Sequence, residues 1–174
     1  MHDLMVSCIT KAAGEVFSAM LGVELSAPEV SVERGTPEAN DGVLSFIGLA
    51  GDWVGTGSLA CSPVLACRIC SQMLMTESKA VDEEVLDAIG ELTNMIIGCA
   101  KNDLEHQLGP LGLSIPTVVY GKNFSTRSPG HEDWTVVPFE WEDKRLNVRL
   151  CLKPRAGASH QTVYGEKQQF VLGD

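Results

Sequence analysis

The chain has 174 residues, of which 44% are hydrophobic and 21% are charged, a composition typical of a folded globular domain. Its formal net charge of -10 disfavours nucleic acid as a partner, because phosphate backbones require clustered Lys and Arg. No apolar run reaches the roughly 20 residues of a membrane span, and the N-terminus lacks the pattern of a secretory signal. These features predict a cytoplasmic protein with no membrane or nucleic acid partner.

The N-terminal part of the chain predicts one long helix followed by a loop. Apolar residues recur at helical spacing over residues 3–22, and Gly22 is a typical helix end. Residues 26–42 are rich in Pro, Gly, Asn and Asp, which indicates a loop with a short strand around residues 30–32.

The next segment predicts a strand pair and a second helix. Strand-like runs over 43–49 and 53–61 flank a short connection typical of a hairpin. Gly55 and Gly57 indicate either a bulge or the close approach of another backbone. A Ser-Pro pair then begins a helix over residues 62–74.

A long third helix is predicted over residues 82–108, with three carboxylates in its first turn and a Gly-Pro pair after its end. Strand-like runs follow over residues 115–120, 134–141 and 146–152. An Asp-Lys pair at 143–144 makes the last two runs a hairpin. The fold class is therefore α+β, with a mostly antiparallel sheet covered by helices. We expect a single domain over 1–174, with its core at about 3–152 and a C-terminal tail at 153–174.

The third helix has two distinct faces. At 3.6 residues per turn, its core face is formed by Val85, Ile89, Leu92, Ile96 and Ala100. The opposite face is a band about 60° wide, formed by Asp87, Glu91, Asn94 and Gly98. Gly98 lies in this row although a glycine costs a helix roughly 1 kcal/mol relative to alanine. Its missing side chain could let another molecule come close. Most polar stripes of this kind are simply the solvated face of a helix.

The segment DAIGELTNMIIG at 87–98 resembles the signature helix of the CheC/CheX chemotaxis phosphatases, in which an acidic or serine residue precedes the pattern E-x-x-N. The residues at the three positions of that pattern are Asp87, Glu91 and Asn94. Downstream, LGLSIPTVVYG at 111–121 resembles the proline-containing strand of that family, with Pro116 in the matching place. The resemblance covers about residues 3–152 and implies the CheC-like fold.

The resemblance also implies a function, which is hydrolysis of the aspartyl phosphate of a CheY-like response regulator receiver domain in chemotaxis. Asn94 would hold the attacking water, because a carboxamide has both donors and an acceptor. Glu91 would pair with a lysine of the receiver. Gly98 would lie at the contact, and Asp87 would lie at its edge or only favour the helix dipole. Magnesium would come with the receiver, so no metal or cofactor of the protein's own is expected.

Members of the family differ in the number of signature helices. The helix over 3–22 has Glu15, but Ser18 stands in place of the asparagine and Lys11 in place of the acid. One site is therefore expected, as in CheX rather than CheC, and by the same resemblance a homodimer.

Other functions are weighed against this one. The family's fold also serves as a non-catalytic receiver-binding or flagellar-switch-like docking module. Cys67 and Cys70 form a C-x-x-C, which could be a redox pair or half of a zinc site. The pair lies a full turn inside its predicted helix and not at the helix end where thiolates are stabilised, and no second pair or histidine pair completes a zinc site, so buried, inert cysteines are the favoured interpretation. A third alternative is a small-molecule enzyme, but the sequence contains no nucleophile, phosphate-loop or zinc motif that would support it.

Overall fold

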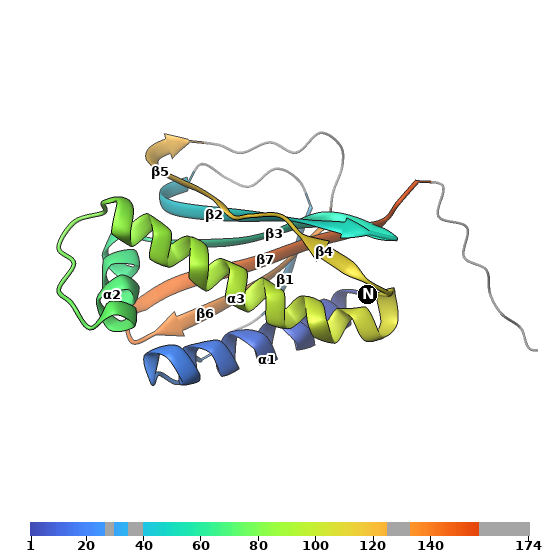
Figure 1. The fold of residues 1–174 in the computed structure, drawn as a ribbon, viewed down its shortest axis with the longest axis horizontal. Helices are drawn as coiled ribbons and strands as arrows, with labels where there is room; N and C mark the ends of the chain where they lie inside the picture. Colours follow the sequence, from blue (N-terminus) through green and yellow to red (C-terminus); the bar gives the residue numbers. More distant parts are fainter. Residues whose placement is uncertain (27–29, 35–39, 125–132, 157–174) are drawn as a thin grey trace, which may run out of the picture.

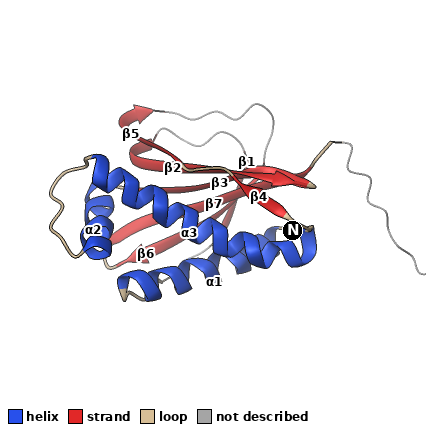
Figure 2. Ribbon diagram, viewed as in Figure 1, coloured by secondary structure: helices blue, strands red, loops and turns tan. Residues whose placement is uncertain are grey.

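The computed structural model describes residues 1–26, 30–34, 40–124 and 133–156, and within them one antiparallel sheet carries helices on one face (Figures 1 and 2). The strand order is β1-β6-β7-β3-β2-β4, and β5 also pairs with β2. The helices are α1 (His2–Leu21), α2 (Pro63–Leu74) and α3 (Glu83–Leu108). The strands are β1 (Ser31–Arg34), β2 (Asn40–Gly51), β3 (Trp53–Cys61), β4 (Leu111–Leu113), β5 (Thr117–Phe124), β6 (Asp133–Trp141) and β7 (Lys144–Pro154). The predicted α+β fold is confirmed.

The three predicted helices are confirmed, and their ends are fixed by local capping. Ser62 Oγ accepts a hydrogen bond from the Leu65 N–H (3.2 Å), and Asp82 Oδ1 accepts one from the Val85 N–H (3.0 Å). Each cap satisfies an N–H group that has no partner inside the first turn. Gly22 ends α1 in the left-handed conformation, with a φ of 64°.

The strand predicted over 115–120 corresponds to β5, which begins two residues later, at Thr117, and extends to Phe124; before it, a non-strand linker over 114–116 follows β4, a short strand that the sequence did not predict. β4 pairs with the end of β2 and β5 pairs with its start. Ser114 Oγ accepts from the Gly48 N–H (2.8 Å), and the Ser114 N–H donates to the Gly48 carbonyl (2.9 Å). Pro116 has no N–H to donate, so a continuous ladder cannot form through this linker.

Two further details differ from the sequence-based prediction. The hairpin between β6 and β7 turns at Glu142 and Asp143 rather than at 143–144, because Trp141 pairs directly with Lys144. The short strand expected around 30–32 is β1, at the edge of the sheet beside β6. The structure describes the chain up to residue 156, so most of the predicted tail lies outside the described residues.

Two glycines of β3 allow close contacts, one with the neighbouring strand β7 and one with α3. A Cβ built on Gly55 would lie 1.9 Å from the Cys151 carbonyl oxygen, in the neighbouring strand. A Cβ on Gly57 would lie 2.8 Å from the Ile97 Cδ1 atom of α3. The register of β3 runs without a shift on both sides, so close approach, and not a bulge, explains these glycines. Gly57 therefore lets α3 lie directly on the sheet.

α1 is long and apolar enough to cross a membrane, and it is the one such helix among the described residues. Charged Lys11 and Glu15 interrupt its apolar run. Its apolar stripe packs against α3 and β6, and Ile9 and Phe17 are fully buried there. Buried helices in the core of globular proteins can have the same length and composition.

Candidate functional site on helix α3

The core face of α3 is confirmed and sets the rotation of the helix on the sheet. All five predicted core residues have no exposed side-chain surface: Val85, Ile89, Leu92, Ile96 and Ala100. Thr93, also buried, donates its hydroxyl to the Ile89 carbonyl (2.7 Å) within the helix. Because this side of α3 is committed to the core, the opposite side must face outward.

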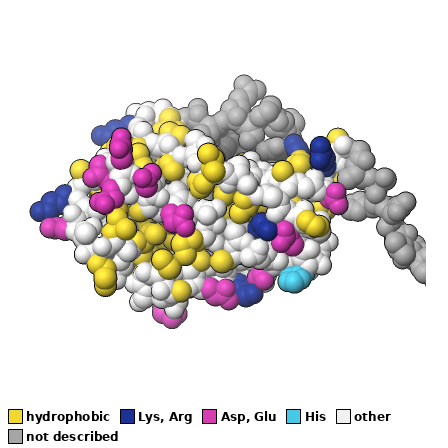
Figure 3. All heavy atoms as spheres, in the orientation of Figure 1, with side chains coloured by type: hydrophobic (Ala, Val, Ile, Leu, Met, Phe, Trp, Pro, Cys, Tyr) yellow, Lys and Arg dark blue, Asp and Glu magenta, His cyan; other side chains and the backbone are white. Residues whose placement is uncertain are grey.

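The predicted site residues lie along that outward side. Asp87 and Glu91 are exposed, and Asn94 and Gly98 are half-buried. Within the described part of the chain, none of the three polar side chains has a hydrogen bond or an ion pair. Figure 3 shows acidic side chains gathered over the same end of the molecule as the first turns of α3 in Figure 1. A carboxylate and a carboxamide, one turn apart and without internal partners, are available to bind a cation and to orient a water.

The segment from β4 to β5 flanks this row on one side. A Cβ built on Gly98 would lie 3.7 Å from Leu113 Cδ1, and one on Gly90 would lie 3.3 Å from Val118 Cγ2 and 3.8 Å from Pro116 Cβ. The 3.7 Å contact is an ordinary one, so packing inside the molecule does not require glycine at position 98. That Gly98 allows the approach of a partner stays a prediction.

The second half of α3 uses its polar side chains differently. Asp103 forms an ion pair with Lys11 of α1 (2.8 Å), and Glu105 pairs with Lys101 (2.8 Å). Glu105 Oε1 also accepts from the Leu111 N–H (2.7 Å), and this bond is the main reason that the pKa of Glu105 is lowered. These contacts fix α3 to its neighbours, and the unpaired polar row lies on the other half of the helix.

Helix α1 lacks the chemistry of a second signature helix. Glu15 and Ser18 are exposed, but Lys11, which stands where the family has an acid, is bound to Asp103. Where a second site would have its acidic residue, the structure thus has a lysine that forms an ion pair between α1 and α3.

The cysteine pair is buried, as the sequence predicted. Cys67 and Cys70 are 9% and 0% exposed, and both are free thiols. Burial raises the pKa of the Cys67 thiol and raises that of the nearby Cys61 to about 12, so neither forms a reactive thiolate at neutral pH. Among the residues that the structure describes, no group of three or more His, Cys, Asp or Glu side chains could hold a metal ion.

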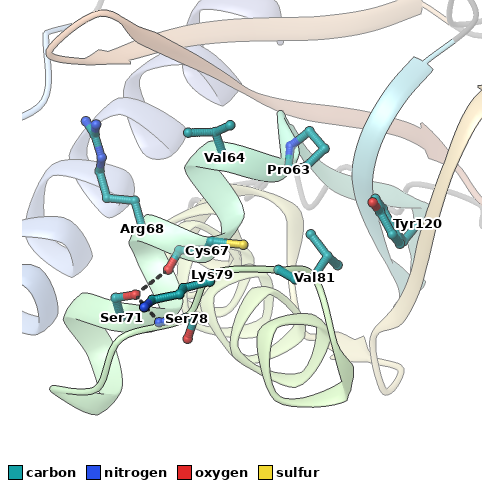
Figure 4. A pocket seen from close by; sticks show the side chains of 10 residues that line it. Pro63, Val64, Cys67, Arg68, Ser71, Ser78, Lys79, Val81 and Tyr120 are labelled. Atoms are coloured by element: carbon teal, nitrogen blue, oxygen red, sulfur yellow. Dashed lines mark hydrogen bonds between the residues drawn. The ribbon is translucent and has the colours of Figure 1, made fainter.

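A cavity of about 440 Å³, which no sequence motif indicated, lies between α2, the segment before α3, and β5 (Figure 4). Its lining residues are Pro63, Val64, Cys67, Arg68, Ser71, Ser78, Lys79, Ala80, Val81 and Tyr120. Several of its polar groups already have partners, since Arg68 pairs with Glu142 (2.6 Å) and Ser71 Oγ donates to the Cys67 carbonyl (2.8 Å). With no carboxylate or histidine in its lining, the cavity offers neither of the usual general acids or bases.

Comparisons with known proteins agree on one family. The family described as chemotaxis phosphatase CheX matches residues 43–140, more than half of the chain. A CheY-P phosphatase CheX from Thermotoga maritima is 29% identical over 131 residues, which cover 75% of this chain and 84% of that protein. The structure of the chemotaxis protein CheX from Vibrio vulnificus is 26% identical with a TM-score of 0.76, and the match covers 86% of this chain and 99% of that one. A chain of the CheX–CheY–BeF3–Mg complex from Borrelia burgdorferi shares the fold at 23% identity, with a TM-score of 0.70 over 85% and 97% of the two chains.

Proposed function

Because the chain belongs to the CheX family of chemotaxis phosphatases, it is a phosphatase of the CheY-type response regulator, and we propose that Glu91 and Asn94 carry the reaction. The observation that supports these two residues is their position on the outward face of α3. They lie one turn apart and have no partner among the described residues. The lining of the described cavity has neither a carboxamide to orient a water nor a carboxylate to pair with a lysine, so the helix face is the better candidate.

The proposed reaction is hydrolysis of an aspartyl phosphate. The oxygen of a water bonds to phosphorus as the bond from phosphorus to the aspartate oxygen breaks, releasing inorganic phosphate, the free carboxylate and a proton. Positioning and electrostatic stabilisation supply most of the rate in such reactions. Asn94 accepts a hydrogen bond from the water and holds it in line, while its amide N–H groups hydrogen-bond the phosphoryl oxygens.

Glu91 docks the helix in this proposal. Its carboxylate pairs with the receiver's lysine beside the phosphoryl group, which fixes the depth to which Asn94 reaches. Asp87 and Gly98 lie at the two ends of the contact. Magnesium comes with the receiver, so the protein has no metal or cofactor of its own.

The wider setting is also proposed. We infer a cytoplasmic homodimer formed of single-domain chains, without a membrane or nucleic acid partner. The burial of the apolar face of α1 in the core supports the absence of a membrane span. The net charge of -10 supports the absence of nucleic acid binding. The dimer rests on the resemblance to CheX alone.

The test follows the decay of phosphorylated receiver domains from the same genome. Wild-type protein accelerates the decay, and Asn94→Ala lowers the turnover rate by roughly 100-fold or more, because the water loses its position. Binding of the receiver should remain nearly unchanged. The matched control is Asn102→Ala, which removes an exposed amide from the same helix about two turns further on.

Two results would contradict the proposal. Full turnover by Asn94→Ala would remove that residue from the site. Binding of receivers by the wild-type protein without any acceleration of decay would favour the alternative, a docking module without catalysis.

A further inference from the structure

Ile115 is one of the most exposed apolar residues among those that the structure describes. Its relative exposure is 86%, and it lies in the linker over 114–116 between β4 and β5. Isoleucine is among the residue types most often buried. A single exposed apolar side chain needs no explanation by itself, so its position and its support decide whether it means anything.

The position of Ile115 is beside the proposed catalytic row. Leu113, two residues before it, packs near Gly98, and Pro116, the residue after it, packs near Gly90. Asn94 lies four residues from each of these glycines, so the linker passes alongside α3 at the level of Asn94. The ribbon follows this path, with the linker between β4 and β5 running alongside α3 (Figure 1).

The linker is held firmly although it belongs to no strand. Ser114 makes two hydrogen bonds with the backbone of Gly48, and its hydroxyl donates to the Ile115 carbonyl (2.9 Å). Pro116 restricts the backbone on the other side of Ile115. A side chain presented on a fixed backbone loses little conformational entropy when a partner covers it.

We propose that Ile115 is an affinity residue for the receiver domain, packing against an apolar part of the receiver surface while Asn94 enters the phosphorylation site. The inference rests on the proposed function, since the same partner must reach the outward face of α3. An apolar contact that does not touch the reacting atoms stabilises the ground state and the transition state of the reaction equally. It therefore affects KM and the dissociation constant rather than kcat.

The experiment compares Ile115→Ala with wild type in two assays on the full chain. One is the rate of receiver dephosphorylation as a function of receiver concentration, and the other is binding of a beryllofluoride-loaded receiver. Ile115→Ala removes three carbon groups, and we expect KM and the dissociation constant to rise about tenfold, the effect of losing roughly two of them from an apolar contact, with kcat unchanged. Ile115→Leu should stay within about threefold of wild type, because volume-conserving apolar exchanges cost little.

Met20→Ala is the control, because Met20 is an exposed apolar residue (44%) near the end of another helix, α1. Unchanged KM and binding in Ile115→Ala, with unchanged thermal stability, would overturn the inference. So would an equal loss in Met20→Ala. If the wild-type protein binds the receiver without hydrolysis, the binding assay still decides the role of Ile115, and the proposed function alone fails. If it binds no receiver, both fail.

Discussion

α1 and α3 are two long amphipathic helices that pack against each other on one face of the sheet, yet only one presents a candidate site. Each buries an apolar stripe, and each has an exposed glutamate with a polar residue three positions later. In α1 that residue is Ser18, and the lysine one turn before Glu15 is bound to Asp103 of α3. In α3 the polar residue is Asn94, and no described residue pairs with Asn94 or with Glu91. The glutamate and the polar residue are thus exposed in both helices, and the helices differ in the residue one turn before the glutamate, which is a paired lysine in α1 and, in α3, an aspartate with no partner among the described residues.

The surroundings of the two helices explain more of this difference than their sequences do. α3 is flanked by the fixed linker that carries Ile115, on the side of its polar row where Asn94 lies. It also rests directly on β3 through the contact of Ile97 with Gly57. Its polar row is therefore held on a rigid base beside an apolar neighbour. We infer that a polar helix face becomes a candidate site when the fold fixes it and leaves it unpaired.

The largest expected effect is the difference in kcat/KM between Glu91→Gln in α3 and Glu15→Gln in α1. Neutralising this carboxylate removes a charge-assisted contact to the receiver and lets Asn94 shift, so kcat/KM should fall by roughly 100-fold. Glu15→Gln, the same change at the matching position of α1, should leave kcat/KM within about twofold, since exposed substitutions away from a site change little. Steady-state dephosphorylation of the receiver measures both variants. Equal losses in the two would show that α1 also contributes to the site.

Two glycine substitutions test how each helix is supported. Gly57→Ala places a methyl group against three atoms of Ile97, and overpacking of this kind lowers the free energy of unfolding by about 1–3 kcal/mol. A Cβ on Gly14 of α1 would have no other atom within 4 Å, so Gly14→Ala should raise the free energy of unfolding by up to about 1 kcal/mol. Chemical denaturation measures both effects. A stabilised Gly57→Ala would contradict the close seating of α3 on the sheet.

The helices and their core faces could be predicted from the sequence because each depends on local information. The 3.6-residue period placed all five core residues of α3, and the Ser-Pro and Asp signals placed the starts of α2 and α3. The linker over 114–116 had one local signal, Pro116, which has no N–H for a strand ladder. The way the linker is held could not be predicted locally, because it depends on hydrogen bonds between Ser114 and Gly48, which are 66 residues apart in the chain.

The site shows the same division between local and distant information. Periodicity put Glu91 and Asn94 on one face, and their exposure agrees with it. Periodicity did not show that Lys11 is paired with a residue of another helix, or that an exposed Ile115 lies beside the row. Both depend on segments that meet only in the folded chain. The cavity beside α2 was missed for the same reason, because Tyr120 and Cys67 come from separate parts of the sequence.

The smallest effect should come from the ion pair that joins the two helices. The side chains of Lys11 and Asp103 are 56% and 30% exposed, and exposed pairs contribute little to stability. The hydrogen bond to Asp103 raises the pKa of Lys11 above its ordinary value of 10.5, so the folded state holds this proton more tightly than the unfolded chain does. Any stabilisation is therefore fully present below pH 10.5 and is lost as the pH rises through the raised pKa.

Lys11→Met should accordingly lower the thermal midpoint slightly at neutral pH, and the difference from wild type should shrink above about pH 10.5 and in high salt. Receiver dephosphorylation should not change, because the pair lies on the half of α3 that holds the fold together. Lys79→Met is the control, since Lys79 contacts Glu77 at 3.4 Å and both side chains are 77% exposed. A loss of turnover in Lys11→Met, with the midpoint nearly unchanged, would mean that the polar face of α1 takes part in the reaction, and the contrast between the two helices would no longer hold.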